Sequence, residues 1–261
     1  MSKKNESGKG KPPPPPKIDD KPRVPGAPKV EPFPLKPSQM IVDGIEGFRR
    51  APLALMLGTF LPFLVSGPFV FAGQSRIADA EEISLGSEEV VAGLAFNLIG
   101  MVLAGAASYP VCVYALRAAR DEAVDLAEPF RDPGRFFAMF TASFWFWAGI
   151  LLGLNFFVLP AVFVFLFYVF FGFVLVDRPD LGGLKALGTS VRIGDKRRIA
   201  LFALTALFGF LLFLCILPVG FGVNIATIAL MYLLLLAGTA VSLVSWASLY
   251  DVLRKDLPDA W

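Results

Sequence analysis

The sequence predicts an all-α membrane protein, a polytopic transmembrane helical bundle with six spans. Of its 261 residues, 56% are hydrophobic and only 18% are charged, whereas an ordinary soluble domain has about 25% charged residues. Four runs, which together make up more than half of the chain, contain no Asp, Glu, Lys or Arg: residues 51–75, 90–116, 136–176 and 199–250. A soluble surface helix needs a polar face, and a span needs about 20 apolar residues, so these runs favour a bilayer.

The lengths of the four runs predict the number of spans. The first two fit one helix each, but a single helix over 136–176 would measure about 61 Å and one over 199–250 about 78 Å, against a hydrocarbon core of about 30 Å. Both runs must therefore fold back, and we expect the turns at 155–160 and 218–222, where Asn, Pro and Gly occur. The predicted spans are 51–73, 89–116, 136–156, 159–177, 199–217 and 224–250.

The distribution of Lys and Arg predicts the orientation. Arg49 and Arg50 precede the first span, and the connections at 117–135 and 178–198 are rich in Arg. The loop at 74–89 instead holds one basic residue against five acidic ones, and the turns after the third and fifth spans carry no charge. Because basic connections stay on the cytoplasmic side, both termini are expected in the cytoplasm.

Residues 1–37 are predicted to form a disordered cytoplasmic tail. They hold eleven of the 21 prolines, nine basic residues and four acidic ones, and such a segment buries too little apolar surface to offset its ordering entropy. Two interpretations stay open: a solvated basic chain near anionic lipid headgroups, or a ligand for the aromatic groove of a protein partner. Residues 38–255 would form the membrane domain, and 256–261 a short cytoplasmic tail.

Two amphipathic segments are predicted to lie at the membrane interface as helices. In 38–50 the apolar face would consist of Ile41, Ile45 and Phe48, and in 181–193 of Leu184, Leu187 and Val191. Each segment leads through a basic pair into a span, and we expect these four residues at the interface: Arg49, Arg50, Arg197 and Arg198. An interfacial helix followed by a two-helix hairpin would thus be an internal repeat, with a middle copy starting within 125–135.

The sequence gives no support for an enzyme. It has no histidine, which excludes Ser–His and Cys–His nucleophiles and His-ligated zinc. No carboxylate lies within a predicted span away from its ends, so an ion-coupled carrier lacks its usual residues. We interpret Asp177 and Asp180 as a helix stop and turn in preference to a metal site, and Cys112 and Cys215 as reduced core residues. We therefore predict no catalytic, metal-binding or cofactor-binding residue, and the net charge of +2 gives no support for nucleic-acid binding.

The most specific pattern inside the membrane is a face of small and polar residues on the second span. Its central members are Asn97, Gly100, Ala104 and Ser108, and Gly93, Cys112 and Ala115 extend the face. Small residues at helical spacing allow close helix packing, and Asn97 could bond across the interface. The alternative is a pathway for a small polar solute. Gly238, Ser242 and Ser245 form a shorter face on the last span, which we expect to be its packing partner.

Two further asparagines, Asn155 and Asn224, fall at the outer ends of spans. Capping of a helix end is the ordinary role of asparagine at such a place. A second interpretation brings them together with Asn97 in an outward-facing polar pocket.

The segment 177–202 resembles a known family. Asp177 ends a span, Ala186, Leu187 and Ser190 follow on a short helix, and Gly194 and basic residues precede the Ile-Ala-Leu-Phe start of the next span. This pattern resembles a broad bacterial group of six-helix integral membrane proteins, similar to the membrane domain attached to some glycerophosphodiester phosphodiesterases. The resemblance covers residues 38–255 and implies a location in the bacterial cytoplasmic (inner) membrane. The soluble phosphodiesterase domain is absent from this sequence.

The leading functional prediction is a non-enzymatic inner-membrane protein that organises lipid or protein partners, and the small-residue faces would also allow a homo-oligomer. The alternative is a permease or export component for a small neutral or amphiphilic solute.

Overall fold

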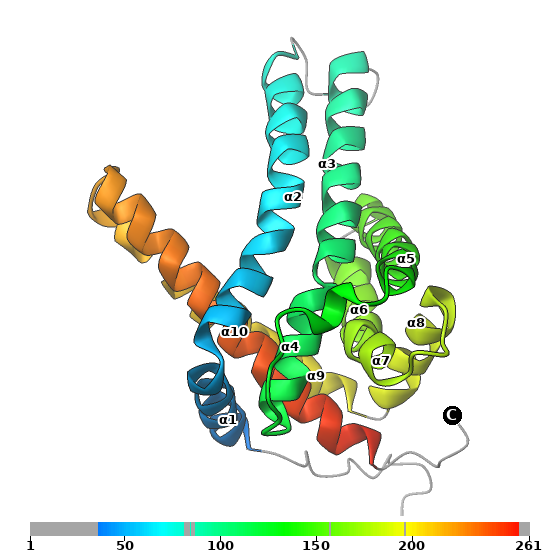
Figure 1. The fold of residues 1–261 in the computed structure, drawn as a ribbon. Coiled ribbons are helices and arrows are strands. Elements are labelled where there is room, and N and C mark those ends of the chain that lie inside the picture. The colour runs from blue at the N-terminus through cyan, green and yellow to red at the C-terminus, as the bar shows by residue number, and fades with distance from the viewer. Residues whose placement is uncertain (1–35, 81–83, 85–86, 157, 196, 256–261) are drawn as a thin grey trace, which may run out of the picture. The chain divides into compact units, whose positions relative to one another are not determined.

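The computed structural model describes residues 36–80, 84, 87–156, 158–195 and 197–255. All regular elements within these residues are helices, so the all-α prediction is confirmed (Figure 1). The predicted N-terminal tail, except for its last two residues, and the C-terminal tail lie outside the described residues.

The first pair of spans is a hairpin. Helix α1 (Pro37–Arg50) leads into α2 (Pro52–Ala78), and α3 (Glu88–Ala107) returns and continues as α4 (Tyr109–Ala119). Helices α2 and α3 lie side by side (Figure 1), and Gly73 and Gly93 let their backbones approach, since a Cβ at either glycine would lie 2.7 Å from the carbonyl oxygen of the other.

The second pair follows the 3₁₀ turn η1 (Glu128–Phe130). Helix α5 (Gly134–Phe156) folds back into α6 (Val158–Tyr168), which continues after a break as α7 (Phe171–Asp177). The first predicted turn is therefore confirmed. At this turn a Cβ on Gly153 would lie 2.6 Å from the backbone nitrogen of Ala161, so glycine is what allows α5 and α6 to meet closely.

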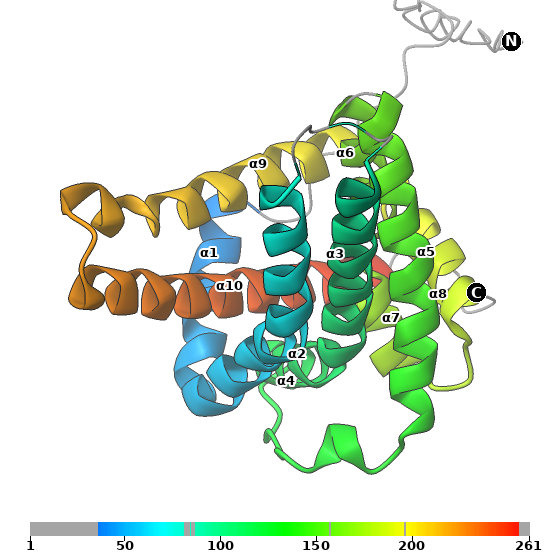
Figure 2. The same ribbon diagram turned by 90° about the horizontal axis from the view of Figure 1, so that it is seen from above.

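The third pair follows α8 (Gly183–Ile193). Helix α9 (Arg198–Leu214) passes through the 3₁₀ turn η2 (Leu217–Phe221) into α10 (Ile225–Arg254), and the two helices run back along one another (Figure 2). Gly222 has a φ of +130°, a conformation that glycine alone adopts readily. Asn224 then caps α10, because its side chain accepts hydrogen bonds from the backbone N–H groups of Ala226 and Thr227, both at 3.0 Å.

Five stretches of the described chain are long and apolar enough to cross a membrane: Pro52–Ala78, Glu88–Ala119, Gly134–Leu154, Leu159–Asp177 and Ile225–Arg254. Helix α9 has 17 residues, the low end of the usual range for a span, and it meets α8 at 103°. The pair makes a sixth span if it is taken as one bent element, so the structure gives five or six spans where the sequence predicts six.

The break between α6 and α7 is bridged by a residue of α8. The hydroxyl of Ser190, which is fully buried, donates to the carbonyl of Phe167 at 3.0 Å and accepts from the N–H of Phe170 at 3.1 Å. In lipid each freed backbone group needs a partner inside the protein. Ser190 supplies a partner to both backbone groups, so α8 satisfies the hydrogen bonds that are lost at the break between α6 and α7.

Helix α1 packs against the protein through a face other than the apolar face that was predicted to lie on the membrane. Its buried residues are Met40, Gly44 and Gly47, whereas Ile45, expected in the apolar face, is 39% exposed. The reason is that α1 packs against α10: a Cβ at Gly44 would lie 2.2 Å from Ser245 Oγ, and that hydroxyl donates to the carbonyl of Met40 at 2.8 Å. Close backbone approach, and not a stripe of large side chains, holds this contact.

Helix α8 likewise packs against the protein, and the residues predicted to face the membrane are divided. Leu187 is buried and Leu184 is 58% exposed, and the other buried residues include Gly183, Ala186 and Ser190. A Cβ on Gly183 would lie 2.4 Å from the carbonyl oxygen of Ala138 in α5, so α8 is pressed against the second hairpin.

The short element that precedes each hairpin contacts the hairpin before it. The turn η1 contacts α4, α8 contacts α5, α6 and α7, and α1 contacts α10 of the last hairpin. The first two contacts join each element to the hairpin just before it in sequence. The third joins α1, at the start of the described chain, to the last hairpin, so each of the three hairpins is contacted by one of these elements. The internal repeat stays a prediction, since η1 is a three-residue 3₁₀ turn where α1 and α8 are α-helices.

Candidate functional site

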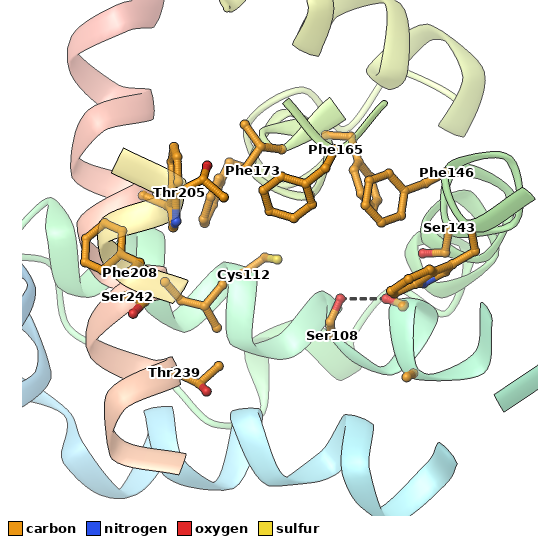
Figure 3. Close-up of a pocket in the computed structure, with 18 of the residues that line it drawn as sticks. Ser108, Cys112, Ser143, Phe146, Phe165, Phe173, Thr205, Phe208, Thr239 and Ser242 are labelled. Carbon is orange, nitrogen blue, oxygen red and sulfur yellow. Dashed lines mark hydrogen bonds between the residues drawn. The ribbon is translucent and has the colours of Figure 1, made fainter. Parts of the chain in front are cut away.

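A cavity of about 480 Å³ lies among the three hairpins (Figure 3). This volume falls within the range of about 300–1,000 Å³ that is usual for small-molecule sites. Its walls come from α3 and α4 of the first hairpin, α5, α6 and α7 of the second, and α9 and α10 of the third. The cavity therefore exists only when all three hairpins are assembled.

Aromatic side chains dominate the wall. Seven of them line the cavity: Phe146, Trp147, Phe165, Phe171, Phe173, Phe208 and Trp246. The polar members are Ser108, Cys112, Ser143, Thr205, Thr239 and Ser242, and Asp, Glu, Lys and Arg are absent from the lining in the described part of the chain. Because transfer of a charge into such a site is costly, the cavity suits a neutral, largely apolar molecule.

The predicted face on the second span is divided between two environments. Ala104 and Ser108 line the cavity, and the Ser108 hydroxyl donates to the carbonyl of Gly105 at 2.6 Å (Figure 3). Asn97 and Gly100 instead face α2: a Cβ on Gly73 would lie 2.8 Å from Asn97 Oδ1, and one on Gly100 would lie 3.1 Å from Cβ of Phe69. Asn97 therefore does not join the cavity lining.

The small residues of the last span that were expected to pack on this face, Gly238, Ser242 and Ser245, have different neighbours. Ser245 contacts α1, and a Cβ on Gly238 would meet Leu212 of α9 and Cys215, the C-cap residue of α9. Of this group, Ser242 lines the cavity together with Ala104 and Ser108. The sequence cannot show this division, because a helix that is apolar on all sides does not reveal which face meets which neighbour.

The polar pocket that the sequence analysis considered, formed by Asn97, Asn155 and Asn224, is not formed by Asn97 and Asn224. Asn224 is used as the cap of α10, and Asn97 packs against Gly73. The side chain of Asn155 lies outside the described residues.

The four basic residues expected at the interface have different surroundings. Arg49 is exposed. Arg50 donates to the carbonyl of Ala118 at 3.0 Å and pairs with Asp121 at 3.2 Å. Arg198 stacks on the ring of Phe167 at 3.9 Å, and Arg197 begins α9 as its N-cap residue. Arg50 and Arg198 therefore have intramolecular contacts beside any contact with lipid.

An ion-pair network joins the ends of three helices, and sequence reasoning missed it. Asp177 at the end of α7 accepts from Arg120 at 2.9 Å, from the hydroxyl of Tyr250 at 3.2 Å and from Arg254. Arg120 also pairs with Asp251 at 2.9 Å. With Asp177 12% and Arg120 18% exposed, these are largely desolvated pairs, which depend strongly on having all partners present.

Asp177 and Asp180 do not form a common site. Asp180 is exposed and takes a bidentate contact from Arg178, with both distances 3.0 Å. These hydrogen bonds from Arg178 hold the pKa of the Asp180 carboxyl below its usual range. Within the described residues, no three His, Cys, Asp or Glu side chains come together as metal ligands would, and Cys112 and Cys215 are free thiols.

Ser143 is one of the members of the cavity wall that sequence reasoning overlooked. It is a single serine in a long apolar run, and nothing in that run distinguishes it from a packing residue. Its side chain is fully buried and its hydroxyl has no hydrogen-bond partner in the part of the chain that the structure describes.

Comparison with family models, curated proteins and solved structures finds no match for this chain. The resemblance to the membrane domain of glycerophosphodiester phosphodiesterases therefore stays a hypothesis. The structure establishes a helical membrane protein with several spans.

Proposed function

We propose that the protein is a non-catalytic membrane protein that binds a lipid or another apolar amphiphile between its three hairpins. The observation that carries this proposal is the uncharged, aromatic-lined cavity of about 480 Å³. An apolar pocket with a few polar groups is the usual form of a small-molecule site. This function keeps the predicted role in organising lipid but moves it from the interfacial helices to the interior.

The cavity wall supports this proposal through its chemistry. Aromatic rings offer large apolar contact area to an aliphatic or planar molecule, and hydroxyls at Thr205 and Ser242 already donate within their own helices. A charged substrate would find no counter-ion among the described lining residues. Binding of a neutral chain is therefore the interaction that this wall favours.

The test compares two equally bulky substitutions on the same helix. Ala104→Phe places a ring in the cavity, because Ala104 lines it, whereas Ala95→Phe places the same ring at an exposed position of α3. Lipids that remain on the detergent-purified proteins are identified and counted by native mass spectrometry. We expect Ala104→Phe to lose a species that the wild type and Ala95→Phe retain. Equal lipid content in all three proteins would overturn the proposal.

The second candidate is a permease or export component, and the cavity also favours it because its hydroxyls lie inside the membrane on several helices. Dithionite quenching of a fluorescent lipid in proteoliposomes measures movement between leaflets. A permease would exceed protein-free liposomes and lose this activity with Ala104→Phe. Retained lipid without accelerated movement would favour binding alone.

We further propose a bacterial inner-membrane location with both termini in the cytoplasm. The support is the alternation of Arg-rich and Arg-poor connections. In a cysteine-free background, Glu46→Cys places an exposed thiol on α1, which precedes α2, and Asp79→Cys places one at the C-terminal end of α2. An impermeant maleimide applied to spheroplasts should label Asp79→Cys alone, and the reverse pattern would invert the orientation.

A further inference from the structure

The hydroxyl of Ser143 lacks the intrahelical hydrogen bond that several other Ser and Thr hydroxyls in these helices make. Four of them in the described part of the chain donate to the carbonyl oxygen four residues earlier, at 2.7–3.0 Å: Thr59, Thr141, Thr205 and Ser242. Such a bond satisfies a hydroxyl where no water is available. The Ser143 oxygen is completely buried and makes no such bond with any described residue.

This oxygen lies against α3 at the edge of the cavity, which both Ser143 and Gly105 line. A Cβ on Gly105 would lie 2.3 Å from Ser143 Oγ, so the hydroxyl occupies space that α3 leaves open only because residue 105 is glycine. Figure 3 shows the Ser143 oxygen turned from α5 toward the side where Ser108 lies. Rotation about one side-chain bond moves a serine hydroxyl between staggered positions, so it can meet a molecule in the cavity without a change in the backbone.

The cavity wall includes other groups that can donate a hydrogen bond. Trp147 and Trp246 line the same cavity, and an indole nitrogen is a donor only. The hydroxyls of Ser108, Thr205 and Ser242 already donate to backbone carbonyls. The Ser143 hydroxyl can donate or accept, whereas an indole N–H can only donate, so an acceptor on the ligand is the group that would suit both.

We propose that the cavity holds a neutral lipid bearing a carbonyl oxygen, and that this oxygen accepts a hydrogen bond from the hydroxyl of Ser143. This inference rests on the proposed function and names its ligand class. The absence of charge from the described lining disfavours phospholipids, whose headgroups are charged and held at the bilayer surface. A neutral isoprenoid quinone and a diacylglycerol share the required chemistry, an apolar chain with a carbonyl.

The experiment uses the full-length protein in detergent. A short-chain isoprenoid quinone is titrated while tryptophan fluorescence is recorded, because Trp147 and Trp246 line the cavity. Dioctanoylglycerol, an alkane of matched chain length and phosphatidylglycerol are then tested as competitors. We expect a neutral carbonyl lipid to bind at least tenfold more tightly than the alkane or phosphatidylglycerol, and the better of quinone and diacylglycerol identifies the source of the carbonyl.

Ser143→Ala removes the donor, and Thr141→Ala is the matched control, a hydroxyl on the same helix outside the cavity lining. Loss of one neutral hydrogen bond should weaken binding of the carbonyl lipid by about 3–10-fold, while alkane binding and the Thr141→Ala protein stay unchanged. Equal affinity of Ser143→Ala and wild type would overturn this inference and leave the proposed function intact. If the wild type binds none of the neutral probes and Ala104→Phe retains its lipids, the proposed function itself fails.

Discussion

The contact between α1 and α10 leads to a prediction that the structure quantifies. A Cβ at Gly44 would lie 2.2 Å from Ser245 Oγ and 2.7 Å from the carbonyl oxygen of Val241. The second of these atoms is backbone and cannot turn away. Gly44→Ala must therefore push α1 from α10 and weaken the hydrogen bond from Ser245 to Met40.

The expected cost follows from two opposing effects. Overpacking of a well-packed contact destabilises the folded state by about 1–3 kcal/mol. Replacement of a helical glycine by alanine stabilises it by about 0.4–1 kcal/mol, because alanine lowers the conformational entropy of the unfolded chain. A net loss of about 1–2 kcal/mol corresponds to a decrease of roughly 2–8 °C in the unfolding midpoint for a chain of this size.

The assay is thermal unfolding of the purified protein in detergent, with Gly188→Ala as control. Gly188 lies within α8, and a Cβ there meets nothing within 4 Å, so this variant should unfold at the wild-type temperature or slightly above it. Adding Ser245→Ala should recover part of the Gly44→Ala loss, because it removes the nearer of the two atoms. The reasoning is refuted if Gly44→Ala unfolds at or above the midpoint of Gly188→Ala.

Three further predictions use the same unfolding assay. Asp177→Asn leaves two largely buried arginines short of a partner and should cost about 3 kcal/mol, whereas Asp180→Asn, at an exposed pair, should cost under about 1 kcal/mol; equal costs would contradict the network. Ser190→Ala orphans a backbone N–H and a carbonyl at the α6–α7 break and should cost about 1–3 kcal/mol, while Ser190→Thr, which keeps a hydroxyl, should cost less. Asn224→Ala removes the cap of α10 and should cost about 0.5–2 kcal/mol, mostly recovered by Asn224→Asp; an unchanged midpoint would show that the cap contributes nothing.

The spans could be predicted because the bilayer imposes a simple rule on sequence. Every stretch found long enough to cross a membrane corresponds to a predicted span, and both turns lie where proline, glycine and asparagine interrupt the charge-free runs. Charge-free length measures the number of crossings when the hydrocarbon core has a nearly constant thickness. The fifth predicted span is the exception, since α9 reaches only 17 residues and bends sharply from α8.

The helix breaks were harder to predict, for two different reasons. Pro110 lies in the first turn of α4 and was an available signal for the break after α3, because proline is favoured there. The break between α6 and α7 has no proline or glycine at its position. It depends on Ser190, twenty residues further along the chain, and a contact of this kind has no local signature.

The faces through which α1 and α8 pack on the rest of the protein were not predicted, because an amphipathic pattern indicates only the side that would lie on lipid. In α1 the residues that meet α10 are Gly44 and Gly47, and a Cβ on Gly47 would lie 2.5 Å from Val244. Within a bilayer, lipid tails are as apolar as leucine, so helices gain from close backbone approach more than from a hydrophobic stripe. The basis for predicting faces in such segments is the spacing of small residues.

Two of the helix breaks lie beside the cavity. Ser108 marks the break in the first hairpin, and Phe171 begins α7 just after the break in the second; both residues line the cavity. Because every backbone group freed at a break needs an internal partner in lipid, bonds such as those of Ser190 make the break in the second hairpin a stable feature of the protein. The cavity beside it is therefore part of the architecture, which is the condition that a binding site within the membrane requires.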